Sequence, residues 1–214
     1  MTDLLYQAAL RFEKLTHTGY RIILGRKTKT FELQLRFPKN SFFHLAGLQY
    51  LGDITFSSQN KEHIYKEILQ KKITITDLQK SVFFDTCFIS ERLQYLQLLE
   101  NMLDVCQLIF FINPKEYIRH TKIYADYLCE YIIPNNTTDV LYYFLIKDRN
   151  SLTKNIYKGC SFFKKHDKDY RHGTAQTKLL LSEKIINVET PQEEIMELYR
   201  NPIYKTDFPI NCNK

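Results

Sequence analysis

The spacing of apolar residues changes near Pro114, and this change constrains the fold more than any other feature. Before Pro114, apolar residues recur mostly every three or four positions, which is typical of helices; beyond it, short apolar runs alternate with turn residues, which is typical of strands. We therefore predict an α+β fold with a helical N-terminal half that includes a β-hairpin, followed by a twisted antiparallel sheet. Without a linker-like segment or repeat, we expect one domain over 1–214, with a helical part at about 1–115, a sheet part at about 120–200 and an irregular tail at 201–214.

The helical half contains five predicted helices and one hairpin. The helices are expected at 3–16, from Phe42 to near Gly52, and at 61–71, 76–84 and 88–112. The 88–112 segment carries two adjacent apolar stripes, so we expect it to be a buried scaffold helix. The hairpin covers 20–37, and its second strand alternates cleanly, with Phe31, Leu33, Leu35 and Phe37 facing inward.

The second half contains four predicted strands and a final short helix. The strands are expected at Ile123–Ile133, Val140–Lys147, Tyr157–Phe163 and Thr177–Ile186. We expect the last three to pair antiparallel, so that the segment from Tyr157 to Lys184 forms a hairpin. Thr190 and Pro191 are typical of a helix start, so a helix is predicted from there to about Arg200.

The tip of that predicted hairpin is dense in lysine, arginine and histidine. Between Tyr142 and Lys184 there are ten Lys and Arg against four Asp and Glu, an excess of +6 that equals the formal charge of the whole chain. Phe162, Phe163 and Tyr170 are interleaved with these cations, as base stacking combined with phosphate contact requires. The stretch therefore favours an anionic partner. A solvated basic hairpin without a ligand is the alternative.

Composition excludes several classes of protein. A hydrophobic content of 44% and a charged content of 25% are typical of a globular chain. No apolar run reaches the length of about 18 residues that a transmembrane helix needs, and the N-terminus lacks the pattern of a signal peptide. We therefore expect a cytoplasmic protein without membrane contact. The five cysteines lack metal-ligand spacing and are expected to be reduced thiols; Cys160 as a nucleophile is a minor alternative.

Strand parity places Tyr157, Gly159, Ser161 and Phe163 on one face of their strand. Hydroxyls and nearby ammonium groups are the types needed to bind a phosphodiester and stabilise charge during its cleavage. The chain lacks a carboxylate cluster, so a two-metal nuclease is not expected. It also lacks a glycine-rich phosphate loop and a Gly-x-Ser-x-Gly elbow. We expect no cofactor and no metal.

Four short motifs together resemble a known family. They are Phe42-Phe43-His44-Leu45-Ala46-Gly47-Leu48, Ala125-Asp126-Tyr127-Leu128, Ser161-Phe162-Phe163 with Tyr170 after it, and Glu183-Lys184-Ile185. In order and spacing they resemble the phage-associated nucleases of the barnase, EndoU, colicin and RelE (BECR) fold, over roughly residues 3–200. The chain departs from the pattern at Lys164, where a proline is expected. The resemblance implies a toxin-like, metal-independent endoribonuclease of a phage or mobile element, in which the substrate's own 2′-hydroxyl attacks the phosphate.

The resemblance and the residue types give a set of expected site residues. The phenylalanine-histidine-leucine motif falls on His44, the expected general base or acid, because an ordinary histidine pKa of about 6.5 suits proton transfer near neutrality. Ser161 and Tyr157 are expected to hydrogen-bond the scissile phosphate, and Lys184 or Arg36 to stabilise its extra charge. RNA binding is expected at Lys164, Lys165, Tyr170, Arg171 and Lys178.

Alternatives remain at this stage. His44 could be a packing residue that pins the start of its helix. The whole chain could be a non-catalytic factor that binds nucleic acid or a host protein on the same fold, since a retained fold with lost chemistry gives the same pattern. An antitoxin or immunity protein is a further expected partner.

Overall fold

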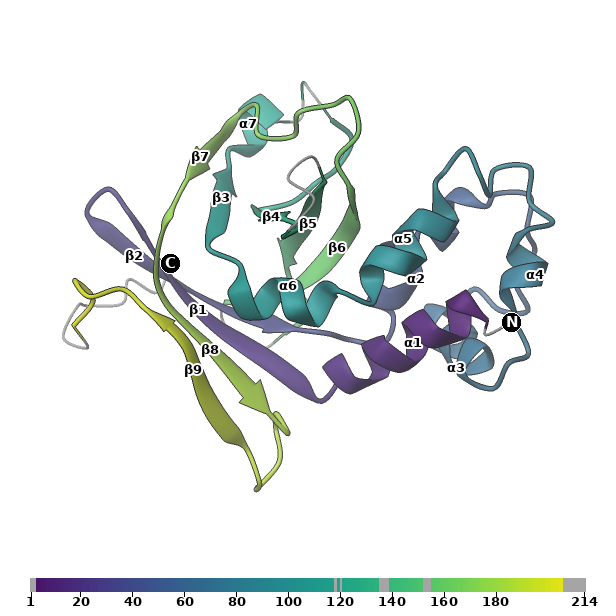
Figure 1. Ribbon diagram of the computed structural model, residues 1–214, viewed down its shortest axis with the longest axis horizontal. Helices are drawn as coiled ribbons and strands as arrows, with labels where there is room; N and C mark the ends of the chain where they lie inside the picture. The colour runs from purple at the N-terminus through teal and green to yellow at the C-terminus, as the bar shows by residue number, and fades with distance from the viewer. Residues whose placement is uncertain (1–2, 118, 120, 135–138, 152–154, 206–214) are drawn as a thin grey trace.

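The computed structural model describes residues 3–117, 119, 121–134, 139–151 and 155–205. Most of the helices and a 3-10 turn lie at one end of the molecule, and a curled sheet with one short helix beside it forms the other end (Figure 1). The helical elements are α1 (Leu4–Leu15), α2 (Ser41–Leu45), η1 (Leu48–Tyr50), α3 (Lys61–Leu69), α4 (Ile75–Leu78), α5 (Ile89–Leu96), α6 (Leu99–Val105) and α7 (Pro114–Tyr117). The predicted tail beyond residue 205, with Cys212, lies outside the described residues.

Nine strands form one sheet within the described residues. They are β1 (Thr18–Arg26), β2 (Lys29–Arg36), β3 (Leu108–Ile112), β4 (Tyr127–Ile132), β5 (Val140–Lys147), β6 (Ile156–Lys164), β7 (Thr174–Gln176), β8 (Lys178–Ile186) and β9 (Glu194–Arg200). Their order in the sheet is β7-β3-β4-β5-β6-β2-β1-β8-β9, and every pair is antiparallel except β2 with β6. The predicted α+β class is therefore confirmed.

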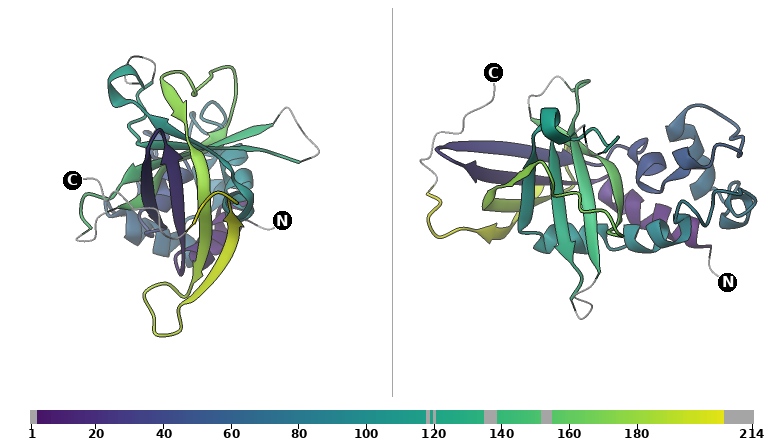
Figure 2. Two further views of the ribbon diagram at one scale, coloured as in Figure 1. Left: turned by 90° about the vertical axis from the view of Figure 1, so that its left-hand side faces the viewer. Right: turned by 90° about the horizontal axis from the view of Figure 1, so that it is seen from above.

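The sheet curls back on itself because β7 and β8 are almost one strand. Only Thr177 separates them, yet β7 pairs with β3 and β8 pairs with β1, on opposite sides of the strand order. The backbone N–H and the hydroxyl of Thr177 both donate to the carbonyl of Ile109, at 2.9 and 2.6 Å. Figure 2 shows the resulting curvature from two further directions. This curling gives the sheet a concave side and an outer side.

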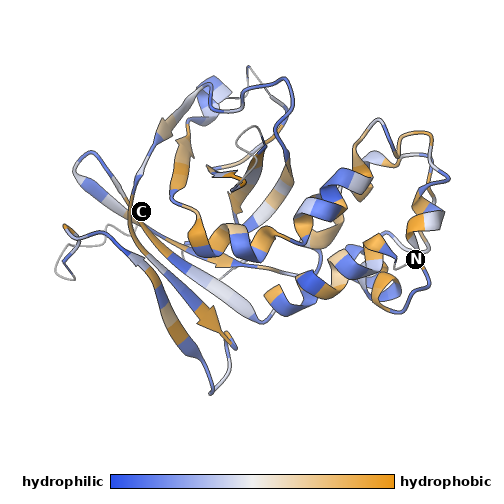
Figure 3. Cartoon of the chain, viewed as in Figure 1, coloured by the Kyte–Doolittle hydropathy of each residue, from blue (hydrophilic) through white to orange (hydrophobic). Residues whose placement is uncertain are grey.

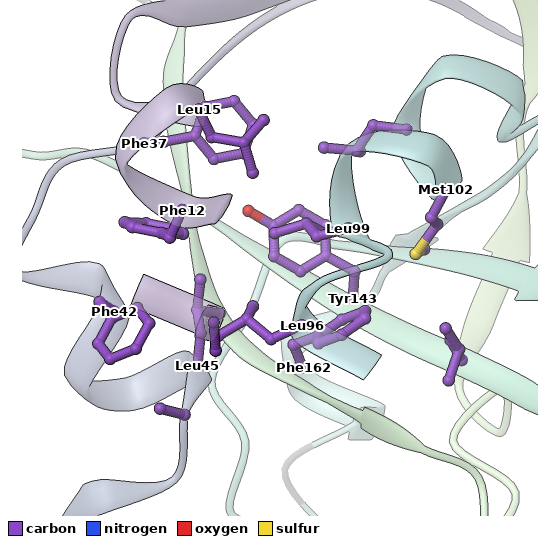
Figure 4. Close-up of a cluster of buried hydrophobic side chains, with 14 of the residues drawn as sticks. Phe12, Leu15, Phe37, Phe42, Leu45, Leu96, Leu99, Met102, Tyr143 and Phe162 are labelled. Atoms are coloured by element: carbon purple, nitrogen blue, oxygen red, sulfur yellow. The ribbon is translucent and has the colours of Figure 1, made fainter. Parts of the chain in front are cut away.

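The main core lies between the concave side and the helices. Phe12 of α1, Phe42 of α2, and Tyr143 and Phe162 of the sheet meet there, each almost fully buried (Figure 4). A second apolar cluster covers the outer side of β3 to β6 and contains Phe110, Ile112, Tyr117, Ala125, Leu128, Tyr142, Phe144 and Phe163. The side chains of β5 and β6 thus contribute to two cores, one on each side of the sheet.

The first predicted elements are confirmed in detail. Along α1, hydrophobic and hydrophilic residues follow each other at helical spacing (Figure 3), and the side chain of Asp3 caps the helix by accepting from the N–H of Tyr6 at 3.0 Å. In the hairpin, Leu33 and Leu35 are fully buried as the alternation predicts. This hairpin joins the centre of the sheet, with β2 beside β6 and β1 beside β8.

The prediction of one helix over 88–112 is wrong. The segment forms α5, α6 and then β3, because the chain turns at Gln97 and Leu98 and because Leu108–Ile112 is rich in β-branched and aromatic residues that pair with β4. The predicted 76–84 helix is also too long, since only α4 is helical there. The strand predicted from Ile123 begins later, at β4.

Two predictions in the second half are wrong for a shared reason, which is long-range strand pairing. The predicted helix from Thr190 to Arg200 is instead β9, which hydrogen-bonds to the open edge of β8. The predicted pairing of the Tyr157 and Thr177 strands does not occur: β6 lies between β5 and β2, whereas β8 lies between β1 and β9. The basic tip is thus a crossover between distant strands and not the turn of a hairpin.

Candidate functional site

A β-bulge in β6 divides the residues that were predicted to share one face. The pairing of β5 with β6 shifts so that Phe144 faces Ser161 while Leu145 faces Gly159, which leaves Cys160 as the extra residue. An extra residue reverses the alternation of the side chains that follow it. The predicted common face of Tyr157 and Ser161 is therefore wrong.

Ser161 and Tyr157 lie on opposite sides of the sheet as a result. Ser161 is only 4% exposed, is paired with Phe144 of the outer cluster, and has no hydrogen-bond partner for its hydroxyl within the described residues. Tyr157 belongs to the main core, where its ring meets that of Tyr127 edge to face at 5.5 Å, and burial raises the pKa of Tyr157 to about 12. The structure does not bring these two hydroxyls together.

Cys160, the bulged residue, is held as a structural thiol. Its thiol donates to the carbonyls of Tyr124 and Phe144 at 3.6 and 3.5 Å, and burial raises its pKa to about 12. A thiol with so high a pKa is a poor nucleophile near neutrality. The cysteines within the described residues, Cys87, Cys106, Cys129 and Cys160, are free thiols.

Lys184 is engaged with two carboxylates of α6. Its ammonium lies 2.8 Å from Glu100 Oε1 and 2.9 Å from Asp104 Oδ2, and its side chain is 12% exposed. The hydroxyl of Tyr20 donates to the other oxygen of Asp104 at 2.6 Å. Lys184 thus ties β8 to α6, and it is the cross-strand partner of Tyr20.

The cations of the basic tip are mostly paired within the chain. Lys164 lies 2.7 Å from Asp139, and Arg171 lies 3.3 Å from Asp169. The tip also contacts acidic residues outside the range from Tyr142 to Lys184. Arg171 lies 3.6 Å from Glu130, and His166 lies 2.9 Å from Glu91. Part of the local charge excess is thus neutralised by acids outside the stretch, Asp139 beside Lys164 and Glu130 beside Arg171.

Tyr170 faces inward, and Lys165 lies near Glu130. The ring of Tyr170 packs against Phe163 at 5.2 Å and against Tyr142 at 5.7 Å, so that it helps to cover the outer cluster. Burial raises the pKa of Glu130, and the nearby charges of Arg171 and Lys165 oppose that shift. Lys178 is the exception among the predicted RNA-binding residues. It lines a hollow at the far end of the β1–β2 hairpin.

His44 lies among cations. Its Nε2 is 2.7 Å from the ammonium of Lys61, the first residue of α3, and its side chain is half-buried where α2 packs against β6. Burial lowers the pKa of His44, and the charges of Lys61 and Lys158 lower it further. Both effects favour the neutral imidazole, which is the form that can accept a proton.

Arg36 and Lys158 stand beside each other across the parallel β2–β6 pair. The guanidinium of Arg36 lies over Gly19, where an added Cβ would come within 2.4 Å of Nη1, and its Nη1 donates to the carbonyl of Leu35 at 3.3 Å. Arg36 Nε is buried without a hydrogen-bond partner in the described part of the chain, although the exposed carboxylate of Glu189 lies 3.9 Å away. We call His44, Lys61, Lys158 and Arg36 the His44 cluster.

A hollow of about 610 Å³ opens beside the His44 cluster at Lys158. It is lined by Tyr124, Ile146, Lys147, Asp148, Arg149, Asn150 and Lys158. Lys158 contacts Asp148 at 3.3 Å, and Lys147 and Arg149 add two further cations. The sequence reasoning missed Lys61 and Lys158. A helix-capping Asn60 marks the position of Lys61, but nothing in the sequence links it to His44.

Two further observations concern metal and membrane. Over the described ranges, no three His, Cys, Asp or Glu side chains are grouped so that they could hold a metal ion. No helix in the same ranges is both long and apolar enough to cross a membrane.

Comparison with known proteins shows the family to which the chain belongs. The model of the family described as phage-Barnase-EndoU-ColicinE5/D-RelE like nuclease4 matches residues 4–211. The chain belongs to this family of BECR-like nucleases. No curated protein and no solved structure matches the chain. The family match spans every predicted catalytic residue, including His44 and Arg36, and every element from α1 to β9.

Proposed function

We propose that this BECR-like protein is a metal-independent endoribonuclease whose chemistry is carried by the His44 cluster. The family match over residues 4–211 is the observation that carries the proposal. The surroundings of His44 support it, because a half-buried imidazole with a lowered pKa stands among Lys61 and Lys158. Such an arrangement supplies a base together with positive charge for a phosphate.

The proposed reaction begins with a proton transfer to His44. In the free protein the ammonium of Lys61 donates to Nε2. A bound phosphodiester attracts Lys61 and frees Nε2, which then takes the proton of the substrate's 2′-hydroxyl. The 2′-oxygen forms a bond to phosphorus, the bond from phosphorus to the 5′-oxygen breaks, and the leaving oxygen takes a proton from water. The products are a 2′,3′-cyclic phosphate and a 5′-hydroxyl.

Arg36 and Lys158 would stabilise the additional negative charge of the transition state. The two residues are cross-strand partners in the β2–β6 pair, and Arg36 keeps a buried N–H without a partner within the described residues. Preorganised cations of this kind cost no reorganisation during the reaction. Ser161, Tyr157 and Lys184 take no part in this version of the site because of where the structure places them.

The test is cleavage of a labelled RNA in EDTA, with the termini of the products analysed. We expect a 2′,3′-cyclic phosphate, and no cleavage where a 2′-deoxynucleotide replaces the residue before the scissile bond. His44→Ala should lower the rate by roughly 10²-fold or more. His63→Ala, an exposed histidine of α3, is the matched control and should leave the rate unchanged. Equal losses in both variants would remove His44 from the mechanism.

A non-catalytic binding factor on the same fold is the second candidate. The observation that favours it is that, of the five predicted catalytic residues, Ser161 and Tyr157 are buried and Lys184 is paired. Purified protein that binds RNA or a host protein, yet releases no cyclic phosphate under any tested condition, would decide for this candidate.

A further inference from the structure

A hollow opens beside the tip of the β1–β2 hairpin. This tip lies at the far end of the molecule from α2 (Figure 1). We call the hollow the hairpin hollow. Its volume is about 960 Å³, and three segments build it: the hairpin tip at 25–30, the β7–β8 junction at 175–180, and the end of β9 with the chain after it, at 199–204. Gln107 and Leu108 at the start of β3 complete it. The curling of the sheet brings these segments together.

The charge of the hairpin hollow is entirely positive. Arg26, Lys27, Lys29 and Lys178 line it, and none of its lining residues is acidic. None of these four cations takes part in the ion pairs found among the described residues, in contrast to the cations of the basic tip. Four like charges around one hollow repel each other and attract an anion.

Turn formation does not favour a lysine at the position that Lys27 occupies in the hairpin tip. Lys27 has φ 54°, a left-handed conformation that glycine or asparagine would adopt at lower cost at a hairpin turn. Arg26 is held by Phe111, with its guanidinium carbon 4.2 Å from the ring centroid. Lys27 therefore stands at the rim at a cost in backbone strain, and Arg26 is held there in a defined position.

Uncharged donors surround these cations. Gln107 and Gln176 are exposed, and Tyr199 and Asn201 form one wall, with the amide of Asn201 donating to the hydroxyl of Tyr199 at 3.3 Å. Amides and a tyrosine ring are suited to the sugar and base of a nucleotide, whereas ammonium and guanidinium groups are suited to its phosphate. The rim residues Lys27, Lys29 and Lys178 are exposed, as a site for a passing chain requires.

The hairpin hollow is distant from the His44 cluster. From Lys29 to Arg36 the strand advances seven residues, or roughly 23 Å at about 3.3 Å per residue. Single-stranded sites of about 4 to 16 nucleotides are usual for proteins that track a nucleic-acid backbone. One strand of RNA could therefore contact both places.

We propose that the hairpin hollow is an anchoring site for the backbone of single-stranded RNA, through Arg26, Lys27, Lys29 and Lys178. This proposal rests on the proposed ribonuclease function. The hairpin hollow would bind the RNA substrate at a point distant from the scissile bond. Each phosphate contact on a single strand contributes about −0.7 to the slope of log affinity against log salt. Removing cations from the hairpin hollow should therefore reduce the salt dependence of RNA binding.

The test uses a fluorescent 12-nucleotide RNA with 2′-O-methyl groups throughout, which 2′-hydroxyl attack cannot cleave. Anisotropy titrations between about 50 mM and 1 M salt give the affinity and its slope. The double variant Lys29→Gln with Lys178→Gln should reduce the slope by about 1.4 and the affinity at 0.15 M salt by roughly tenfold. The double variant Lys14→Gln with Lys72→Gln, which removes two exposed lysines at the helical end, is the matched control and should bind like the wild type.

Equal losses in the two double variants, or none in the Lys29 and Lys178 pair, would overturn the proposal. A charge-reversed pair, Lys29→Glu with Lys178→Glu, should weaken binding further, and thermal melting checks that each variant is folded. The two proposals fail differently. A protein that binds the 2′-O-methyl strand here but never cuts RNA refutes only the ribonuclease. A protein that cuts RNA with an unchanged KM in the Lys29 and Lys178 pair refutes only the anchoring site.

Discussion

Replacing Lys184 by methionine should destabilise the fold by about 2 to 3 kcal/mol and should not act through the chemistry of RNA cleavage. The ammonium of Lys184 makes charge-assisted hydrogen bonds to Glu100 and Asp104, and such bonds contribute about 1.5 to 3 kcal/mol each. The two carboxylates are 36% and 30% exposed, so water can rehydrate them once the ammonium is lost. The expected total therefore lies below the plain sum of the two bonds, which is about 3 to 6 kcal/mol.

The measurement is urea denaturation followed by far-UV circular dichroism. Lys178→Met is the matched control, because Lys178 lies on the same strand, is exposed, and has no ion pair among those of the described residues. For a chain of this size, the expected loss in Lys184→Met corresponds to a fall in Tm of roughly 4 to 10 °C. A double-mutant cycle with Asp104→Asn should show coupling, because the two groups share one hydrogen bond.

One result would refute this reasoning. If Lys184→Met is as stable as the wild type to within about 0.5 kcal/mol but no longer cleaves RNA, Lys184 belongs to the catalytic machinery, and its pairing with α6 is incidental to stability. Wild-type cleavage activity at a temperature well below the lowered Tm, with an unchanged KM, is the outcome that we expect.

Three further predictions concern the bulge and the His44 cluster. Because the pKa of His44 is lowered and the base must be neutral, the rate of RNA cleavage should stay constant from neutral pH down to the ordinary histidine pKa of about 6.5 and decrease only below it. Lys61→Met removes a charge that lowers the pKa of His44, so the decrease should begin at a higher pH in a pH–rate profile. Gly159→Ala should destabilise the protein by about 1 to 3 kcal/mol in thermal melts, since an added Cβ would lie 2.4 Å from the buried hydroxyl of Tyr143. Cys160, whose pKa is raised to about 12, should react with iodoacetamide at pH 8 more slowly than an unfolded-chain cysteine, as mass spectrometry of a time course would reveal.

Local patterns predicted the elements whose partners are near in sequence. The first helix and the β1–β2 hairpin follow from apolar spacing, an Asp3 cap and a clean alternation in 31–37. The segment 108–112 was assigned to the wrong class because its apolar spacing also fits a helix, and only its pairing with β4 decides for a strand. The same holds for β9, whose start resembles a helix cap.

The candidate site was less predictable because its geometry depends on one inserted residue and on distant charges. Strand parity cannot reveal the bulge at Cys160, which separates Tyr157 from Ser161. A charge count over a window cannot include Asp139 and Glu130, which pair with Lys164 and Arg171 from outside that window. His44 was found because a residue type and a motif coincide, whereas its partner Lys61 belongs to another helix.

The position of the β1–β2 hairpin has a consequence for how the chain folds during synthesis. The hairpin is complete once about 37 residues have emerged, but its neighbours β6 and β8 end at Lys164 and Ile186. At about 5 to 20 residues per second, the edge that pairs with β6 stays open on the ribosome for roughly 6 to 25 seconds and the edge that pairs with β8 for roughly 7 to 30 seconds. During that interval the exposed edges can pair with other chains. A ribosome stalled before β8 would therefore present a half-built sheet that is prone to aggregation.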